Sequence, residues 1–279
     1  MLKKIILLIV CVAPSICFAF DHQYVEWSKI LKTGVIYNKE NTKSKVNYNK
    51  IDLSELNVVV NNLLKTSKKD LQSFRQSEKL AFFINLYNAL TLRLIKSHYK
   101  ELKEDGNSIK SLRKGFPSFT SPWSQKLFTL FGKESTLDEI EHGYIRGAKS
   151  GFDNYKKLYN DPRIHFAVNC ASIGCPALQD HAFTADHLNQ QLEAAQVNFL
   201  KDRSRNYVDE KKKTVYLSKI FDWYEDDFKK GLRGYHSLID FIVKNQDSLA
   251  LNESQKKLIQ SKQFEIDYTD YNWQLNDQF

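Results

Sequence analysis

Residues 161–178 bring together several side chains that are capable of covalent chemistry. The segment reads DPRIHFAVNCASIGCPAL and contains His165, Asn169, Cys170 and Cys175. A glycine and a proline flank the second cysteine, so we expect both cysteines on or beside a tight turn, where reactive side chains are often presented. A cysteine thiolate is a nucleophile that an imidazole base can activate. This segment is therefore the first candidate for a chemical site.

The two cysteines allow three interpretations. A Cys170–Cys175 disulfide would staple the turn, a thiolate of either residue would act as a nucleophile, and a metal site would combine both cysteines with His142 and His165. The disulfide and the nucleophile exclude each other while the bond is closed, although a redox-controlled pair would be each in turn. Because the spacing matches no zinc ribbon or finger, we expect no metal.

A second group of titratable residues lies on a helix that a capping box, TLDE at residues 136–139, predicts to run to about residue 148. Glu139, His142 and Arg146 fall at positions i, i+3 and i+7, on one face of this helix. That face is either a solvated surface or, if another part of the chain covers it, an imidazole oriented by a carboxylate. The second arrangement is what general base catalysis requires.

The choice of base depends on the short strand that we expect over residues 163–170. Five positions separate His165 from Cys170, so their side chains would point to opposite faces of that strand. His142 belongs to another element and can approach either cysteine. We therefore expect His142 to be the base, with His165 as the second candidate.

Two asparagines interrupt a helix, expected over residues 78–99, that is otherwise apolar almost all round. Such a helix is central and buried in a soluble protein. Asn85 and Asn88 are three residues apart and share one face. A buried amide without a partner costs about 1–3 kcal/mol, so both side chains must form hydrogen bonds. They either tie a neighbouring loop to the core or line a pocket.

The remaining pattern predicts a mostly helical α+β fold with a few short strands around the central buried helix. We find no internal repeat and no linker, which favours a single domain over residues 20–279. Further helices are expected over residues 54–65, 184–200, 235–244 and 253–261, a hairpin over 206–217 and a last strand over 264–268.

The first 19 residues have the pattern of a signal peptide. Lys3 and Lys4 precede an apolar run over residues 5–13, and the small residue Ala19 marks the expected cleavage site. The apolar run is too short to span a bilayer comfortably, so we expect no transmembrane segment in the mature chain. Export to the periplasm or beyond the cell follows as an expectation, and an oxidising compartment favours a disulfide.

The composition excludes several classes of protein. With 279 residues, 42% hydrophobic and 27% charged, the chain is neither collagen-like nor of low complexity nor broadly disordered. The formal charge of +8 falls to +6 without residues 1–19, which carry two lysines and no acid. Because the lysines are scattered and no basic stripe is interleaved with aromatic residues, we expect no nucleic-acid partner.

Five sequence blocks together resemble the family called domain of unknown function 547. They occur in the family's order over about residues 75–275: AFFINLYNALTLRLI (81–95), TLDEIEHGYIR (136–146), DPRIHFAVNCASIGCPAL (161–178), KIFDWYEDDF (219–228) and DYNWQLND (270–277). Members include exported bacterial proteins as well as plant and animal proteins, and the family name implies no activity.

The resemblance also implies a set of motif residues. The matching positions are Asn85, Tyr87, Asn88, Glu141, His142, Arg146, Asp161, Pro162, Arg163, His165, Asn169, Cys170, Cys175 and Pro176. The matching acid is Glu141 rather than Glu139, and on an α-helix Glu141 would point about 100° away from His142. Gly174 departs from the polar small residue that the family often has before the second cysteine.

The leading functional hypothesis is thiol-dependent hydrolysis or acyl transfer in a pocket of cysteine, histidine and asparagine side chains. The expected catalytic residues are Cys175, Cys170, His142 and His165. The expected substrate-binding residues are Asn85, Asn88, Arg146, Arg163, Asn169 and Glu141, with Asn169 or Asn85 donating to an oxyanion and Arg146 or Arg163 holding an anionic group. The alternative is a non-catalytic binding module rigidified by a Cys170–Cys175 disulfide. In either case we expect a small-molecule or peptide ligand and no cofactor.

Overall fold

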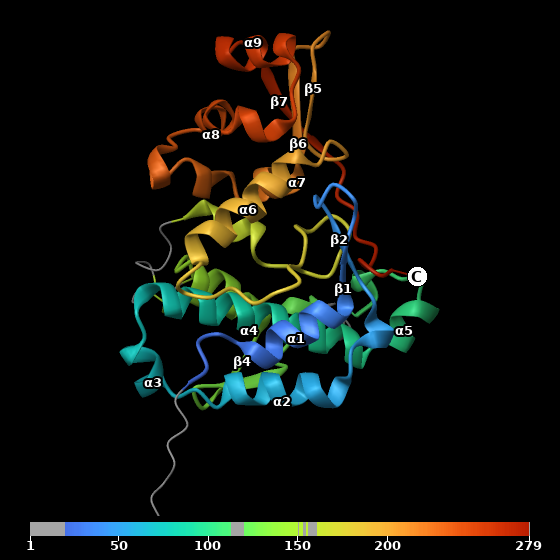
Figure 1. Ribbon diagram of the computed structural model, residues 1–279, viewed down its shortest axis with the longest axis vertical. Coiled ribbons are helices and arrows are strands. Elements are labelled where there is room, and N and C mark those ends of the chain that lie inside the picture. The colour runs from blue at the N-terminus through green and yellow to red at the C-terminus, as the bar shows by residue number, and fades with distance from the viewer. Residues whose placement is uncertain (1–19, 113–119, 150, 153–154, 156–160, 279) are drawn as a thin grey trace, which may run out of the picture.

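The computed structural model describes residues 20–112, 120–149, 151–152, 155 and 161–278. The signal peptide expected over residues 1–19 lies outside these ranges. Over the part that is described, the chain forms a mostly helical α+β fold with three small sheets, which confirms the expected fold class (Figure 1). No helix within these ranges combines the length and the apolar character needed to cross a bilayer.

The first hydrophobic core surrounds a central helix, α4 (Gln76–Ser97). Its residues 80–92 are all buried, which explains why this stretch is apolar almost all round. Helix α4 begins earlier than expected because the Glu78 carboxylate accepts a hydrogen bond from the backbone N–H of Arg75. Helix α2 (Leu53–Leu64) packs along α4, and α1 (Val25–Gly34) packs on α2 (Figure 1). Two shorter helices, α3 (Lys68–Ser73) and α5 (Tyr99–Glu104), precede and follow α4.

The second core is formed by Phe166 and by elements that follow the cysteines in the chain. Its helices are α6 (Leu188–Lys201), α7 (Lys219–Trp223), α8 (Leu238–Lys244) and α9 (Glu253–Ser261). Its sheet pairs β5 (Tyr207–Asp209) antiparallel with β6 (Thr214–Ser218), and β6 parallel with β7 (Glu265–Thr269). The expected hairpin and last strand are thereby confirmed. Phenylalanines dominate this core: Phe166, Phe199, Phe221, Phe228 and Phe241.

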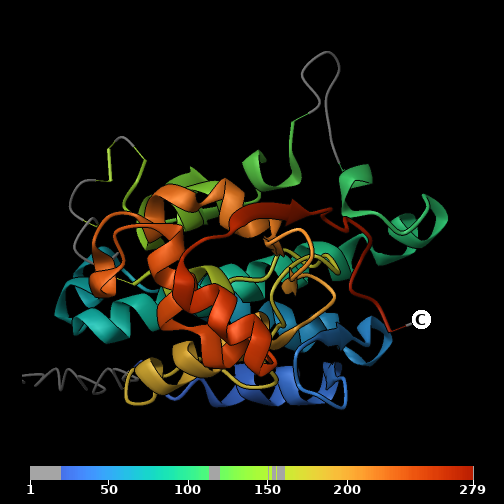
Figure 2. The ribbon, with the colours of Figure 1, turned by 90° about the horizontal axis from the view of Figure 1, so that it is seen from above.

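Two short hairpins and the segment that follows β7 complete the described fold. The hairpins are β1 (Val35–Tyr37) with β2 (Ser44–Val46), and β3 (Phe128–Leu130) with β4 (Lys133–Ser135). After β7 the chain leaves the sheet and runs back across the molecule to β2, where Val46 pairs with Asp277. This red segment is visible in both ribbon views (Figures 1 and 2). It links the two cores.

Two expected elements take a different form. The strand expected over residues 163–170 is wrong, because residues Pro162–Phe166 form a 3-10 helix. Proline suits the first position of a helix, and the Asp161 carboxylate accepts the backbone N–H of Arg163, so this local cap outweighs the β-favouring residues. The capping box at residues 136–139 is confirmed, but the helix that follows is a π-helix, Glu139–Ile145, and ends before residue 148.

Candidate functional site

A pocket of about 440 Å³ is walled by residues of both cores. This volume suits a small-molecule ligand or a short piece of a larger one. Its polar lining includes Glu141 and His142 of the π-helix, His165 of the 3-10 helix, and both cysteines. Its aromatic lining comprises Tyr87, Trp123, Trp223, Tyr224, Tyr271 and Trp273.

The pocket brings together half of the residues that the sequence suggested as a site. His142, His165, Cys170, Cys175 and Glu141 all line it, although they come from three separate elements. The other five lie outside its described lining: Asn85, Asn88, Arg146, Arg163 and Asn169. The members that can act as nucleophile, base or acid are thus those that share the cavity.

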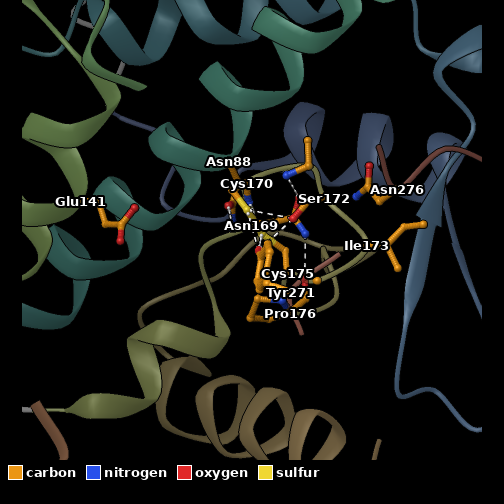
Figure 3. Close-up of a disulfide and its surroundings, with 12 residues drawn as sticks. Asn88, Glu141, Asn169, Cys170, Ser172, Ile173, Cys175, Pro176, Tyr271 and Asn276 are labelled. Carbon is orange, nitrogen blue, oxygen red and sulfur yellow. Dashed lines mark hydrogen bonds between the residues drawn. A yellow bond between two sulfur atoms is a disulfide. The ribbon is translucent and has the colours of Figure 1, made fainter. Parts of the chain in front are cut away.

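The two cysteines are joined in a disulfide, with their sulfur atoms 2.01 Å apart. Of the three interpretations, this is the arrangement that the structure contains. Among the residues that it describes, no group of three or more histidine, cysteine or acidic side chains is placed to hold a metal ion. We call residues 170–175 the cysteine loop; it lies on the pocket wall, and Figure 3 shows the Glu141 carboxylate pointing toward it.

Hydrogen bonds from two neighbouring side chains hold the cysteine loop. The Asn169 side chain accepts from the N–H of Ala171 and donates to the carbonyl of Pro176. The buried guanidinium of Arg205 donates to the carbonyls of Gly174 and Cys175 at 2.8 and 2.9 Å, and to that of Ile173 at 3.3 Å. The loop is therefore tied down independently of its disulfide.

Residues 271–277, which we call the closing segment, run beside the cysteine loop. The N–H groups of Ile173 and Gly174 donate to carbonyls of the closing segment, at Gln274 and Asn272. Tyr271 lies directly on the loop, because Gly174 has no side chain: a Cβ atom there would lie 2.7 Å from the Tyr271 ring. This close approach is a physical reason for glycine at position 174.

The π-helix places Glu141, the acid that matches the family motif, in the same pocket as His142. On an α-helix Glu141 and His142 would diverge, whereas here both side chains line the pocket, and Glu141 Oε1 lies 4.0 Å from His142 Nδ1. Both residues belong to a π-helix, a form that is often found at functional sites. Glu141 is 8% exposed, and its Oε1 accepts a hydrogen bond of 2.6 Å from the Tyr224 hydroxyl.

The best-oriented imidazole of the pocket is that of His165. Its Nε2 lies 2.9 Å from a carboxylate oxygen of Asp227, which is fully buried, and its ring stacks on Tyr224 with centroids 4.0 Å apart. Burial lowers the pKa of His165, and the charge of Arg146 adds to this, against the opposing effect of Asp227. His165 is therefore neutral at pH 7. Since its Nε2–H donates to Asp227, Nδ1 is the acceptor nitrogen of this tautomer.

Asp227 is an ion-pair centre inside the protein. Burial alone would raise the pKa of Asp227, but the His165 hydrogen bond and the Arg146 charge hold this pKa well below its usual range. Its carboxylate also accepts hydrogen bonds from Arg146 Nε at 2.9 Å and from Lys230 Nζ at 2.7 Å. Asp227 remains ionised at pH 7.

The hydrogen bonds of His142 differ from those expected of a base. Its Nδ1 lies 2.8 Å from Nη1 of Arg146. A guanidinium has donors only, so Nδ1 accepts this bond and Nε2 carries the proton of the neutral ring. In this tautomer His142 presents a hydrogen-bond donor at Nε2. The base expected at His142 is therefore better matched by His165.

The predicted residues outside the pocket have their polar groups paired with protein. The Asn85 side chain bonds to both the N–H and the carbonyl of Phe183, and Asn88 bonds to Ala167 and Asn169 in the same way. These contacts match the alternative in which the amides tie loops to the central helix. Arg163, 2% exposed, pairs with Asp161 and Glu193.

Three residues of the site were not singled out in the sequence: Tyr224, Asp227 and Tyr271. All three lie within the two C-terminal blocks of the resemblance, which was the available signal. Asp227 follows Glu225 and Asp226, so nothing in the local pattern distinguishes the buried acid from its exposed neighbour.

The His165–Asp227 pair predicts that acid destabilises the protein. Below the usual histidine pKa of 6.5, the unfolded chain takes up a proton that folded His165 does not. The free energy of unfolding therefore decreases as the pH is lowered. One such proton gives a slope of up to about 1.4 kcal/mol per pH unit. Urea unfolding between about pH 8 and pH 5 measures it. His165→Gln should flatten this slope and exposed His187→Gln should not; equal slopes in all three proteins would contradict the assignment.

Comparison with known proteins identifies a family. The model described as protein of unknown function, DUF547, matches residues 71–200. No curated protein and no solved structure matches the chain. The matched range includes Glu141, His142, His165 and both cysteines, while Asp227 lies beyond it. Residues 71–200 of the chain therefore match the domain of unknown function 547 family.

Proposed function

We propose that this protein is a thiol-dependent acyl hydrolase or acyltransferase, with a cysteine of the reduced Cys170–Cys175 pair as its nucleophile. The observation that carries the proposal is that both sulfurs share a pocket with His165, an imidazole oriented by the buried Asp227. A nucleophile, a base and a group that orients the base form the general pattern of covalent catalysis. A disulfide that only staples a turn does not need these neighbours.

In this mechanism a thiol reductant first opens the disulfide. The thiol proton of the attacking cysteine passes to Nδ1 of His165, and Asp227 stabilises the imidazolium that results. The thiolate attacks the acyl carbon of the substrate, the imidazolium protonates the leaving group, and a thioester forms. Water or an acceptor molecule then attacks the thioester, again with His165 as base, and the free thiol returns. The Nε2–H of His142 supplies a donor for the negative charge on the acyl oxygen.

The aromatic residues of the pocket wall favour a ligand with an extended apolar face. Trp223, Tyr271 and Trp273 lie against one another, with ring centroids 4.5 to 5.6 Å apart, and all three line the cavity. We infer an acyl donor that is a small molecule or a peptide segment. We also propose export through the leader pattern at residues 1–19, so that the cysteines work where a disulfide can form and reopen.

The test uses p-nitrophenyl acetate as an unspecific acyl donor. We expect the reduced protein to release one equivalent of p-nitrophenolate in a burst and to carry an acetyl thioester on Cys170 or Cys175, located by mass spectrometry of its peptides. Loss of a general base lowers a rate by roughly 10²–10⁴-fold, so His165→Gln should slow the burst by at least a hundredfold. His187→Gln is the matched control, because His187 is exposed and does not line the pocket.

Single replacements, Cys170→Ser and Cys175→Ser, identify the nucleophile and do not depend on whether His165→Gln folds. One of the two should abolish the burst. If the variant with both replacements still releases p-nitrophenolate as fast as the reduced wild type, the proposal is wrong.

A non-catalytic binding module is the second candidate, and the aromatic wall favours it. Trp223 is 44% exposed, lines the same pocket as the disulfide and packs against Tyr271 and Trp273. In this alternative the closed Cys170–Cys175 bond rigidifies a ligand groove. It predicts saturable quenching of tryptophan fluorescence by a ligand in the oxidised protein and no thioester in the reduced one.

A further inference from the structure

The two sulfur atoms of the disulfide have different surroundings. Both cysteines line the pocket, but Cys170 is half-buried whereas Cys175 is only 6% exposed. Of the two residues, Cys170 is therefore the more accessible to a molecule that enters the pocket. Figure 3 shows both sulfurs with Tyr271 and Ser172 around them.

The sulfur of Cys175 accepts a backbone N–H, whereas the groups that the structure describes around the sulfur of Cys170 are hydroxyls. The Cys175 sulfur accepts the backbone N–H of Cys170 at 2.9 Å and the Tyr271 hydroxyl at 3.2 Å. That hydroxyl lies equally close to the sulfur of Cys170, and 2.8 Å from the Ser172 hydroxyl. The Ser172 hydroxyl itself lies 3.3 Å from the sulfur of Cys170. Ser172 can donate to Tyr271 while Tyr271 donates to Cys175, which uses each proton once. Burial raises the pKa of Tyr271 to about 12, so the phenol keeps its proton at pH 7.

We propose that the Cys170–Cys175 disulfide undergoes directed thiol–disulfide exchange with a small aliphatic thiol in the pocket, in which Cys170 is attacked and Cys175 leaves. The incoming thiolate forms a bond to the sulfur of Cys170, the Cys170–Cys175 bond breaks, and its electron pair stays on Cys175 as a thiolate. A second molecule of the same thiol attacks the mixed disulfide on Cys170. The products are the dithiol protein and the disulfide of the small thiol, so two electrons pass to the protein.

The direction follows from the stabilisation of the leaving group. Exchange is faster when the departing sulfur is the better-stabilised thiolate. The two donors on Cys175 would remain in place for its negative charge, and hydrogen bonds to a charged acceptor are stronger than those to a neutral one. Arg205, which holds the carbonyl of Cys175, keeps this sulfur beside its donors. The incoming thiol can lose its proton to His165, which lines the same pocket.

This exchange goes beyond acyl transfer and does not require it. It assigns a reaction to the oxidised protein, while the proposed hydrolase uses the reduced one. The exchange can therefore be measured without any acyl donor, and either proposal can fail while the other holds.

The experiment traps the first step. The oxidised protein is mixed with excess glutathione and iodoacetamide, quenched with acid and digested, and both adducts are located by mass spectrometry. We expect glutathione on Cys170 and carbamidomethyl on Cys175. Glutathione found mainly on Cys175, or divided equally between the two cysteines, would overturn the proposal.

Replacement of Tyr271 by phenylalanine tests the cause of the direction. Loss of a hydrogen bond to a charged group should slow opening by roughly tenfold to a hundredfold and move part of the glutathione to Cys175. Tyr216→Phe is the matched control, because its hydroxyl contacts Lys212 in the β5–β6 hairpin and not the disulfide. An unchanged rate and unchanged adduct positions in Tyr271→Phe would reject the role of the phenol.

Discussion

Replacement of Asp227 by alanine should lower the free energy of unfolding by about 3–5 kcal/mol, the range found when one partner of a buried ion pair is removed. The carboxylate is fully buried and accepts from His165, Arg146 and Lys230. Alanine leaves the charge of Arg146, whose side chain is only 15% exposed, without its carboxylate. It also leaves the Nε2 of His165 without an acceptor.

Asp226→Ala provides the matched control for Asp227→Ala. The two acids are neighbours in the chain, but Asp226 is exposed, so its loss should change the free energy of unfolding by no more than about 0.5 kcal/mol. Urea unfolding measures both variants. If Asp227→Ala does not fold, Asp227→Asn, which keeps the shape of the side chain, should fold with an intermediate loss. Equal stabilities of the Asp226 and Asp227 variants would show that the ion-pair centre contributes nothing.

Replacement of Arg205 by methionine should cost about 3 kcal/mol and loosen the cysteine loop. Methionine preserves much of the apolar stem. It loses the donors to Ile173, Gly174 and Cys175, the ion pair with Asp202 and the contact of the guanidinium with the Phe199 ring. A charged hydrogen bond contributes about 1.5–3 kcal/mol, and several are lost together. Urea unfolding gives the free energy, and amide hydrogen exchange at residues 174 and 175 reports the mobility of the loop.

Arg203→Met separates the loss of loop contacts from the loss of a positive charge. Arg203 is exposed and its guanidinium bonds to the carbonyl of Ala250, away from the cysteine loop. We expect nearly unchanged exchange at residues 174 and 175 in this variant. If Arg205→Met leaves hydrogen exchange in the loop as slow as Arg203→Met does, then the disulfide and residues 271–277 suffice to hold the loop.

The elements that the sequence predicted well are those specified by local pattern. The apolar residues of α2 recur at helical spacing, and α4 is apolar enough that only a buried helix accommodates it. The β5–β6 hairpin is likewise bounded by its own turn residues. In these cases tertiary packing reinforces the local preference.

The predictions of secondary structure that were wrong concern segments whose backbone conformation depends on a few local hydrogen bonds. Residues 163–170 contain strand-favouring side chains, but Pro162 and the Asp161 cap start a 3-10 helix there. The π-helix at Glu139–Ile145 also differs from an α-helix by a hydrogen-bond register that side-chain periodicity does not reveal.

Only part of the candidate site could be predicted from the sequence, for a physical reason. The cysteines and histidines have side chains that suggest chemistry at any position. Asp227 and Tyr271 matter through their partners, His165 and the cysteine loop, which lie 62 and about 100 residues earlier in the chain. The sequence favoured His142 over His165 as the base because the expected strand directed His165 away from the cysteines.

The position of the closing segment has a consequence for how the protein is made. Tyr271 follows Ser172, its hydrogen-bond partner, by 99 residues. A ribosome adds about 5–20 residues per second, so the cysteine loop is synthesised roughly 5–20 seconds before the residues that cover it. During this interval both thiols of the nascent chain lack the closing segment and are exposed to oxidants and to other cysteines. The pocket is completed late, and its cysteines pass through a period of unprotected reactivity before they acquire their final neighbours.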